Sequence, residues 1–197
     1  NHFPSFSFGV VVDGELIVTG SEGNSNITNQ TKANTRTMYR IASMSKSVTA
    51  MAIIKLRDEG KLKLDDPVSN YIPELKNQAL TKDAAPITIR ELLTHSSGLP
   101  EDNPWGDRQL ADTEEELIEL FKKQLSFSNV NGTEYEYSNV GFATLGLIIK
   151  KVTGLAYSEY INQHFFKRLG MQAAWDYRKV PTDQLAMCYH YVYDSFK

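Results

Sequence analysis

The first twenty residues constrain the fold more than any other segment of this chain. Every second residue from Phe6 to Val12 is apolar, and Asp13-Gly14 follows as a signal for a tight turn. Residues 15–20 then return as a second strand, so the pattern predicts a β-hairpin. Because an isolated hairpin is only marginally stable in water, further strands are expected beside it.

A helix that follows the hairpin carries the first candidate for chemistry. Residues 21–36 are polar and predict an exposed loop, and residues 38–41 predict a short extended entry. A helix is expected from about Ser43 to Glu59, with Gly60 as its stop. It is apolar nearly all round between Val48 and Ile54, which predicts a buried central helix.

Capping signals place most of the remaining helices. Two capping boxes predict helix starts at Thr88 (with Glu91) and at Thr113 (with Glu116). Another helix should run from about residue 138 to 152, with Gly154 as its stop, and a fourth, capped by Ser158, should end near residue 170. In the tail, tyrosines at positions 189, 191 and 193 alternate as in a strand.

Composition excludes several classes of protein. Hydrophobic residues make up 41% and charged residues 23% of the chain, which is typical of a soluble globular domain. The net charge of -3 is spread without a long run of one sign, so neither a nucleic-acid surface nor a polybasic membrane patch is expected. No apolar stretch is long enough to span a bilayer. Cys188 is the single cysteine, which excludes an internal disulfide and predicts a small buried side chain.

Ser43 and Lys46 form an S-x-x-K pair at the start of the predicted helix. Free N–H groups and the helix dipole favour negative charge there, and three residues make about one turn, so both side chains share a face. A serine hydroxyl becomes nucleophilic when a neighbour takes its proton, and a lysine shielded from water can do so. The alternative is that Ser43 caps the helix and Lys46 extends into water.

Tyr137-Ser138-Asn139 stands immediately before another apolar helix. Tyr137 can act as a phenolate base or a proton relay where lysines stabilise its anion. Asn139 offers an amide that can bond both a lysine and a substrate carbonyl. The alternative is structural, with Ser138 or Asn139 capping the helix and Tyr137 packing against its surroundings.

Together these elements resemble a known family, the class C β-lactamases with the related penicillin-binding proteins, esterases and D-amino peptidases. The resemblance extends over residues 6–190. Four segments carry it, in the order that the family has them: residues 39–46 (YRIASMSK), 60–73 (GKLKLDDPVSNYIP), 87–100 (ITIRELLTHSSGLP) and 135–141 (YEYSNVG).

The resemblance implies an acyl-enzyme mechanism. Ser43 would attack a carbonyl carbon, Lys46 and Tyr137 would manage its proton, and Asn139 would hold the substrate and Lys46 in place. The backbone N–H of Ser43 would supply half of an oxyanion hole. No metal and no cofactor is implied. His95 invites assignment as a triad histidine, but the matching motif implies that it shapes a loop.

The implied fold is α/β, of the serine β-lactamase and DD-peptidase type: an antiparallel sheet flanked by helices, with a mostly helical subdomain. We expect one catalytic hydrolase domain that is incomplete at its C-terminus. Residues 1–64 would form the hairpin and the nucleophile helix, residues 65–175 the helical subdomain, and residues 176–197 a return towards the sheet. The family's third motif, Lys-Thr-Gly or His-x-Gly, is absent from the sequence.

The missing motif has consequences for partners and activity. A further C-terminal segment or chain is expected to complete the sheet, so residues 1–197 alone should be poorly stable and nearly inactive. The predicted function is hydrolysis of a small-molecule or peptide substrate, with a small ester or D-amino-acid peptide favoured over a β-lactam. The alternative is a relative that is acylated without turnover, or an inactive scaffold. The resemblance slightly favours an exported, periplasmic or secreted protein.

Overall fold

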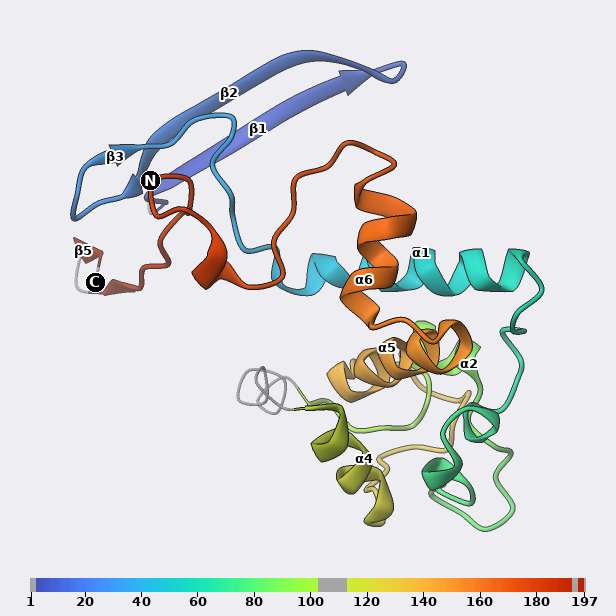
Figure 1. Ribbon diagram of the computed structural model, residues 1–197. Helices are drawn as coiled ribbons and strands as arrows, with labels where there is room; N and C mark the ends of the chain where they lie inside the picture. The colour runs from blue at the N-terminus through green and yellow to red at the C-terminus, as the bar shows by residue number, and fades with distance from the viewer. Residues whose placement is uncertain (1–2, 103–112, 193–194, 197) are drawn as a thin grey trace. The chain divides into compact units, whose positions relative to one another are not determined.

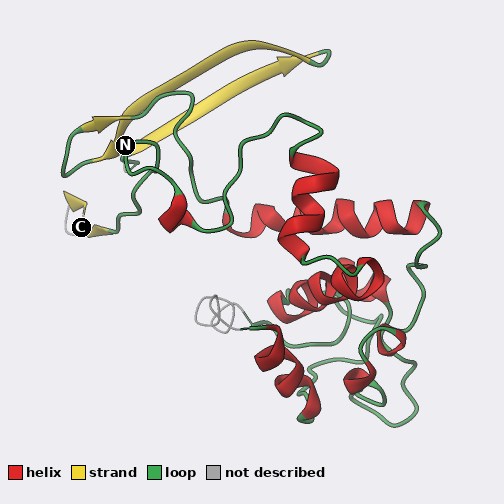
Figure 2. Ribbon diagram, viewed as in Figure 1, coloured by secondary structure: helices red, strands yellow, loops and turns green. Residues whose placement is uncertain are grey.

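The computed structural model describes residues 3–102, 113–192 and 195–196, and divides the chain into two compact units. One unit comprises residues 1–42 with 171–197, and the other comprises residues 43–170. All the described strands belong to the first unit, whereas the described residues of the second form helices and loops, as the colouring of Figure 2 shows. The sequence therefore separates its strand-forming and helix-forming parts much as its hydrophobic patterns predict.

A twisted antiparallel hairpin forms the main part of the first unit (Figure 1). Strand β1 (Ser5–Val12) pairs with β2 (Glu15–Asn26), with Val10 opposite Val18. The turn at Asp13 and Gly14 has positive φ at both residues, 50° and 84°, which matches the twist of the strands that it joins. The hairpin prediction is confirmed.

The segment after the hairpin differs from its prediction as a polar loop. Strand β2 continues to Asn26, and the two-residue strand β3 (Thr31–Lys32) pairs with it, so the sheet has the order β1-β2-β3. Asparagine, serine and threonine obscured these strands, because they are typical of loops, whereas here Ser25 is buried and its hydroxyl donates to the Thr31 carbonyl oxygen. Both β3 and the end of β2 therefore lie within a segment that composition alone assigns to a loop.

The tail of the chain returns to the first unit. A 3₁₀ turn spans Tyr177–Lys179, and the short strands β4 (Tyr191–Val192) and β5 (Ser195–Phe196) pair with each other. The Tyr189 hydroxyl oxygen accepts a hydrogen bond of 2.8 Å from the Ile27 N–H. Cys188 is exposed, so the prediction of a buried cysteine is wrong.

Helix α1 (Ser45–Asp58) opens the second unit and ends in the expected glycine stop. The Gly60 N–H donates to the Arg57 carbonyl oxygen and the Lys61 N–H to that of Leu56, a Schellman arrangement. Only one face of α1 is buried, and Met51 on another face is 47% exposed. The prediction of a helix buried nearly all round is therefore wrong, because some of its apolar side chains lie outside the buried face.

The other helices of this unit pack with α1 around one hydrophobic core. They are α2 (Ile89–Leu93), α4 (Glu114–Lys122), α5 (Asn139–Thr153) and α6 (Tyr157–Ile161), with 3₁₀ turns at Val68–Asn70 and Pro73–Leu75 and a π-helical turn at Asn162–Phe166. Both predicted capping boxes, at Thr88 and Thr113, are formed. Helix α6 starts after Ala156 without a side-chain cap, so the predicted cap at Ser158 is wrong.

The core of the second unit is central to the placement of the site. Helix α5 packs against α1, α2 and α6, and its Leu145, Ile148 and Ile149 are fully buried. Its C-terminal Gly154 has φ 73°, in the left-handed region, as predicted for a glycine stop. Burial of α5 thus fixes its N-terminus, at Asn139, relative to the start of α1.

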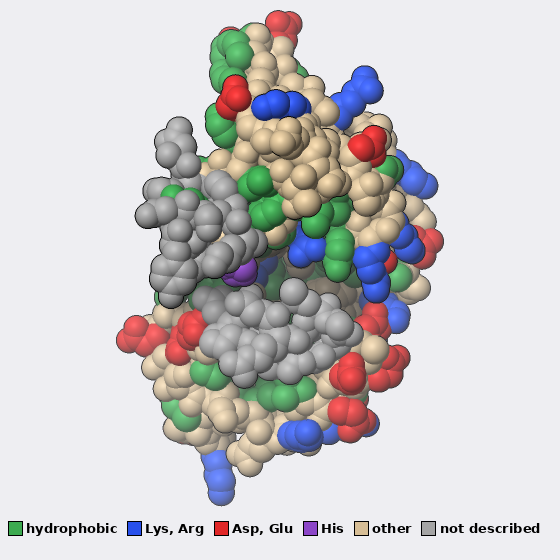
Figure 3. All heavy atoms as spheres, turned by 90° about the vertical axis from the view of Figure 1, so that its left-hand side faces the viewer, with side chains coloured by type: hydrophobic (Ala, Val, Ile, Leu, Met, Phe, Trp, Pro, Cys, Tyr) green, Lys and Arg blue, Asp and Glu red, His purple; other side chains and the backbone are tan. Residues whose placement is uncertain are grey.

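The surface carries charges of both signs, and acidic and basic side chains both occur on the face drawn in Figure 3. Within the described residues, no single helix has the length and apolar character that a membrane span requires, although α5 passes that test jointly with Tyr157–Phe166, across a bend of 75°.

Candidate active site

Ser43 lies in a 3₁₀ turn, Ala42–Met44, directly before α1. Its hydroxyl group is exposed and does not cap the helix, because the N-cap position is Met44 and has no side-chain hydrogen bond. Ala42, the preceding residue, has φ 43°. A left-handed conformation costs a non-glycine residue about 1–2 kcal/mol, and such strain is typical of functional sites. The backbone therefore holds Ser43 in a conformation that helix propensity alone does not explain.

Lys46 links the first turn of α1 to α5. Its Nζ atom donates to Ser43 Oγ at 3.0 Å and to Asn139 Oδ1 at 2.6 Å. The same atom lies 4.7 Å from the centre of the Tyr137 ring, within the range of a cation–π interaction. Lys46 therefore points across the start of α1 and does not extend into solvent.

Tyr137 faces the same serine from the start of α5. Its hydroxyl oxygen is 2.6 Å from Ser43 Oγ, and either atom can be the donor. Burial acts to raise the pKa of Tyr137, but the neighbouring Lys46 ammonium group and the hydrogen bond with Ser43 outweigh it, so the net shift of this pKa is downward. A lowered pKa increases the fraction of Tyr137 present as phenolate at neutral pH, and the phenolate is the form that can accept a proton.

The start of α5 is held by two caps. Ser138 Oγ accepts a hydrogen bond from the Gly141 N–H at 3.1 Å, so the predicted cap is present. The Asp102 carboxylate accepts from the N–H groups of Asn139 and Val140, at 2.6 and 2.8 Å, and from Ser138 Oγ at 3.1 Å. The sequence analysis missed Asp102, because no local motif connects it with a helix that begins 37 residues later.

His95 supports the segment that carries Tyr137. Its Nδ1 atom accepts from the Ser138 N–H at 3.0 Å, and its carbonyl oxygen accepts from the Glu136 N–H at 2.7 Å. Its ring stacks on that of Tyr137, with centroids 4.6 Å apart. Burial, assisted by the charge of Lys46 and opposed by Asp102, lowers the pKa of His95. His95 therefore stays neutral at pH 7 and positions Tyr137 without contacting Ser43.

A glycine lets two loops approach each other next to this segment. Gly98 has φ 76°, and a Cβ atom there would lie 2.2 Å from the Asn129 carbonyl oxygen. The Glu136 carboxylate accepts from Ser128 Oγ, from the Asn129 side chain and from the Glu101 N–H. These contacts fix the backbone that leads into Tyr137 and give the motif at residues 87–100 a structural explanation.

The four predicted site residues thus come together within one unit, and they form a continuous hydrogen-bonded set: Ser43, Lys46, Tyr137 and Asn139. Within the described part of the chain, no group of three or more His, Cys, Asp or Glu side chains is placed to hold a metal ion. The arrangement has the parts for nucleophilic catalysis by a serine: an exposed hydroxyl, a phenol within proton-transfer distance and an ammonium group beside both.

Comparison with known proteins identifies the family of this chain. A family model described as Beta-lactamase matches residues 1–188. Protein flp of Staphylococcus aureus (strain MW2) is 35% identical over 179 residues, which cover 87% of this chain and 34% of that protein. The chain therefore spans about a third of the length of this curated relative.

Two solved structures share the fold. The octameric penicillin-binding protein homologue from Pyrococcus abyssi is 31% identical with a TM-score of 0.82, over 98% of this chain and 46% of that chain. A class C β-lactamase is 29% identical with a TM-score of 0.76, over 93% of this chain and 49% of that chain. The family predicted from four sequence segments is confirmed. The chain belongs to the β-lactamase family, and its fold is that of the serine β-lactamases and penicillin-binding proteins.

Proposed function

We propose that this chain supplies the nucleophile and the proton-transfer groups of a serine hydrolase that acts through an acyl-enzyme. The observation that carries the proposal is an unbroken set of hydrogen bonds: Lys46 Nζ donates to both Ser43 Oγ and Asn139 Oδ1, and Ser43 Oγ is also hydrogen-bonded to the Tyr137 hydroxyl group. A serine that only stabilised the fold would not need its exposed hydroxyl group to contact both a phenol and an ammonium group.

Acylation would begin with proton transfer from Ser43 Oγ to the phenolate oxygen of Tyr137, over the 2.6 Å that separates them. Ser43 Oγ then forms a bond to the substrate carbonyl carbon, and the bond to the leaving group breaks as that group takes the proton. Lys46 stabilises the Tyr137 anion by its charge. Water then attacks the acyl-serine ester, which releases the acid and restores the Ser43 hydroxyl.

Asn139 is proposed to orient the substrate as well as Lys46. Its Oδ1 atom accepts from Lys46 Nζ, and the amide NH₂ of an asparagine is a group that can donate to a substrate carbonyl. The backbone N–H of Ser43 is proposed as one donor to the oxyanion that develops during attack. Both roles depend on the capped start of α5, because Asn139 is its first residue.

The proposed substrates are esters or amides, with a small ester or a D-amino-acid peptide favoured over a β-lactam. This preference rests on the segment His95-Ser96-Ser97-Gly98-Leu99-Pro100, which looks more like the esterase and peptidase branch of the family than the dedicated β-lactam resistance enzymes. In the structure this segment supports Tyr137 through His95.

A second candidate function is acylation without turnover, as in a penicillin-binding or sensor-like protein. The same hydrogen-bonded set that activates Ser43 for acylation serves both functions. They differ in the fate of the acyl-enzyme: steady release of product from a chromogenic ester indicates a hydrolase, whereas one stoichiometric burst indicates a binding protein.

The test of both functions is covalent labelling. A fluorophosphonate or penicillin-type probe should label Ser43, as read by intact mass and peptide mapping. The Ser43→Ala variant should remain unlabelled. Ser47→Ala is a matched control, because Ser47 lies in the first turn of α1, four residues after Ser43, and its hydroxyl donates to the Met44 carbonyl oxygen at 2.8 Å. Label on another serine would refute the assignment of the nucleophile.

A further inference from the structure

A pocket of about 370 Å³ lies beside Lys46, within the unit of residues 43–170. Its volume falls in the range of small-molecule sites in proteins, about 300–1,000 Å³. It is bounded by α1, α4, α5 and the start of α6. The lining residues that matter most are Lys46, Thr49, Leu117, Ala143, Gly146 and Tyr157.

The walls of this pocket are apolar apart from a few hydroxyl groups and two charged side chains. Thr49 Oγ1 and the Tyr157 hydroxyl group are 2.7 Å apart, and Thr49 Oγ1 also donates to the Ser45 carbonyl oxygen at 3.5 Å. A hydroxyl oxygen has two lone pairs, so the pair offers acceptors to a ligand O–H. Gly146 leaves one wall open, since a Cβ atom there would meet only Tyr157 Cδ2, at 3.8 Å. A planar or branched apolar group therefore has space next to a polar anchor.

Both charged groups on the wall already have partners. Lys46 Nζ donates to Ser43 and Asn139, and the Glu114 carboxylate forms an ion pair with Lys150. An ionic ligand would lose its hydration without gaining a free counter-charge, which is costly. The pocket therefore favours a neutral molecule, with the hydrocarbon stem of Lys46 as part of the contact surface.

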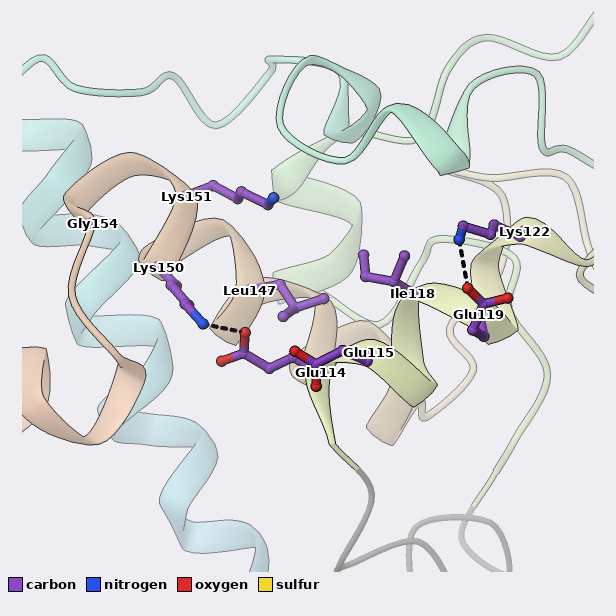
Figure 4. Close-up of a pocket in the computed structure, with 9 residues that line it drawn as sticks. All are labelled: Glu114, Glu115, Ile118, Glu119, Lys122, Leu147, Lys150, Lys151 and Gly154. Atoms are coloured by element: carbon purple, nitrogen blue, oxygen red, sulfur yellow. Dashed lines mark hydrogen bonds and ion pairs between the residues drawn. The ribbon is translucent and has the colours of Figure 1, made fainter.

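A neighbouring hollow of about 500 Å³ between α4 and α5 makes a useful contrast (Figure 4). Ion pairs Lys150–Glu114 and Lys122–Glu119 border it, and Lys151 and Glu115 add further charges. Charged side chains of both signs keep this hollow well hydrated. Glu114 and Leu147 line both spaces, so the charged hollow and the more apolar pocket adjoin each other at α4 and α5.

We propose that the pocket beside Lys46 is a binding site for a small neutral molecule with an apolar, preferably aromatic, body and one hydroxyl or carbonyl group. The polar group bonds to the pair formed by Thr49 and Tyr157, and the body packs between α4 and α5 near Gly146. Lys46 lines this pocket whereas Ser43 is not among its lining residues, so we expect its occupancy to be separable from acylation of the serine.

The test uses p-cresol as a neutral probe and 4-methylbenzoate as its charged counterpart, with methyl-labelled protein observed by NMR. Saturable shifts of the Leu117 and Ala143 methyl groups, with intermolecular NOEs to p-cresol, are expected. 4-Methylbenzoate should bind at least about tenfold more weakly. Absence of saturable shifts, or NOEs confined to residues elsewhere, would overturn the proposal.

Variants place the ligand and separate this site from the proposed nucleophile. Gly146→Leu fills the pocket and should weaken p-cresol binding about tenfold or more, whereas the matched variant Gly146→Ala should change it little. Ser43→Ala should bind p-cresol as the unaltered chain does, even though it cannot be acylated. Equal affinity in Gly146→Leu and Gly146→Ala would contradict the placement, and the NOEs decide the matter if Gly146→Leu fails to fold.

Discussion

Replacement of Asp102 tests how the start of α5 is held. The carboxylate accepts hydrogen bonds from two backbone N–H groups and one hydroxyl group, all at the N-terminus of this helix. The first helical N–H groups have no partners within the helix, and the helix dipole favours a negative charge there. Asp102→Ala removes the charge and all three bonds, whereas Asp102→Asn keeps one acceptor oxygen.

The expected loss in the free energy of unfolding follows from these contacts. Loss of a capping side chain costs about 0.5–2 kcal/mol, and loss of the charge–dipole interaction about 0.3–1 kcal/mol. Asp102→Ala should therefore lower the free energy of unfolding by about 1–3 kcal/mol, because Ser138 still supplies the second cap. Asp102→Asn should cost about 0.3–1 kcal/mol, which is mainly the charge term.

Urea unfolding followed by circular dichroism measures this loss. With a slope of about 1–3 kcal/mol per molar urea, Asp102→Ala should lower the midpoint by about 1 M. Asp83→Ala is the control: Asp83 is exposed, lies in the same unit and caps no helix, so its replacement should change the free energy of unfolding by less than about 0.5 kcal/mol. An Asp102→Ala midpoint equal to that of Asp83→Ala would show that the carboxylate does not hold α5.

Two other predictions concern the proton-transfer groups and the hairpin. Lys46→Ala and Tyr137→Phe should each slow acylation of Ser43 about 10²-fold, and the double variant should be little slower than either single variant. Additive losses in the double variant would contradict a shared role, as would slower acylation in the control Tyr135→Phe. In this chain, β1 amides should exchange with solvent much faster than α5 amides, because Val11 of β1 and its partner Leu16 of β2 are 62% and 61% exposed. Hydrogen-exchange mass spectrometry measures this difference, and equal protection of β1 and α5 would be the contrary result.

Local patterns were the part of this fold that the sequence predicted well. The boxes at Thr88 and Thr113 involve residues three positions apart, so the residue types alone specify the contacts. The same holds for Gly154, whose left-handed conformation ends α5. Ser43 and Lys46 also lie three positions apart, which is why their mutual contact could be anticipated.

Contacts between distant segments could not be predicted from such patterns. Strand β3 consists of Thr31 and Lys32 and owes its existence to pairing with β2, which no property of those two residues specifies. Asp102 likewise becomes a cap only because the loop that carries it lies against α5. The exposure of Cys188 follows from the course of the tail, whereas its residue type favours burial.

The segment Tyr137-Ser138-Asn139 shows why two explanations of one motif need not compete. Ser138 caps α5, as the structural alternative requires, and a cap fixes the backbone of the residues on both sides of it. Tyr137 and Asn139 are those residues, and they reach Ser43 and Lys46, respectively. If capping by Ser138 were the only role of this segment, the side chains at positions 137 and 139 could be of other types. Here the cap is the device that brings a phenol and an amide to the proposed nucleophile, so a change in the cap should affect stability and reactivity together.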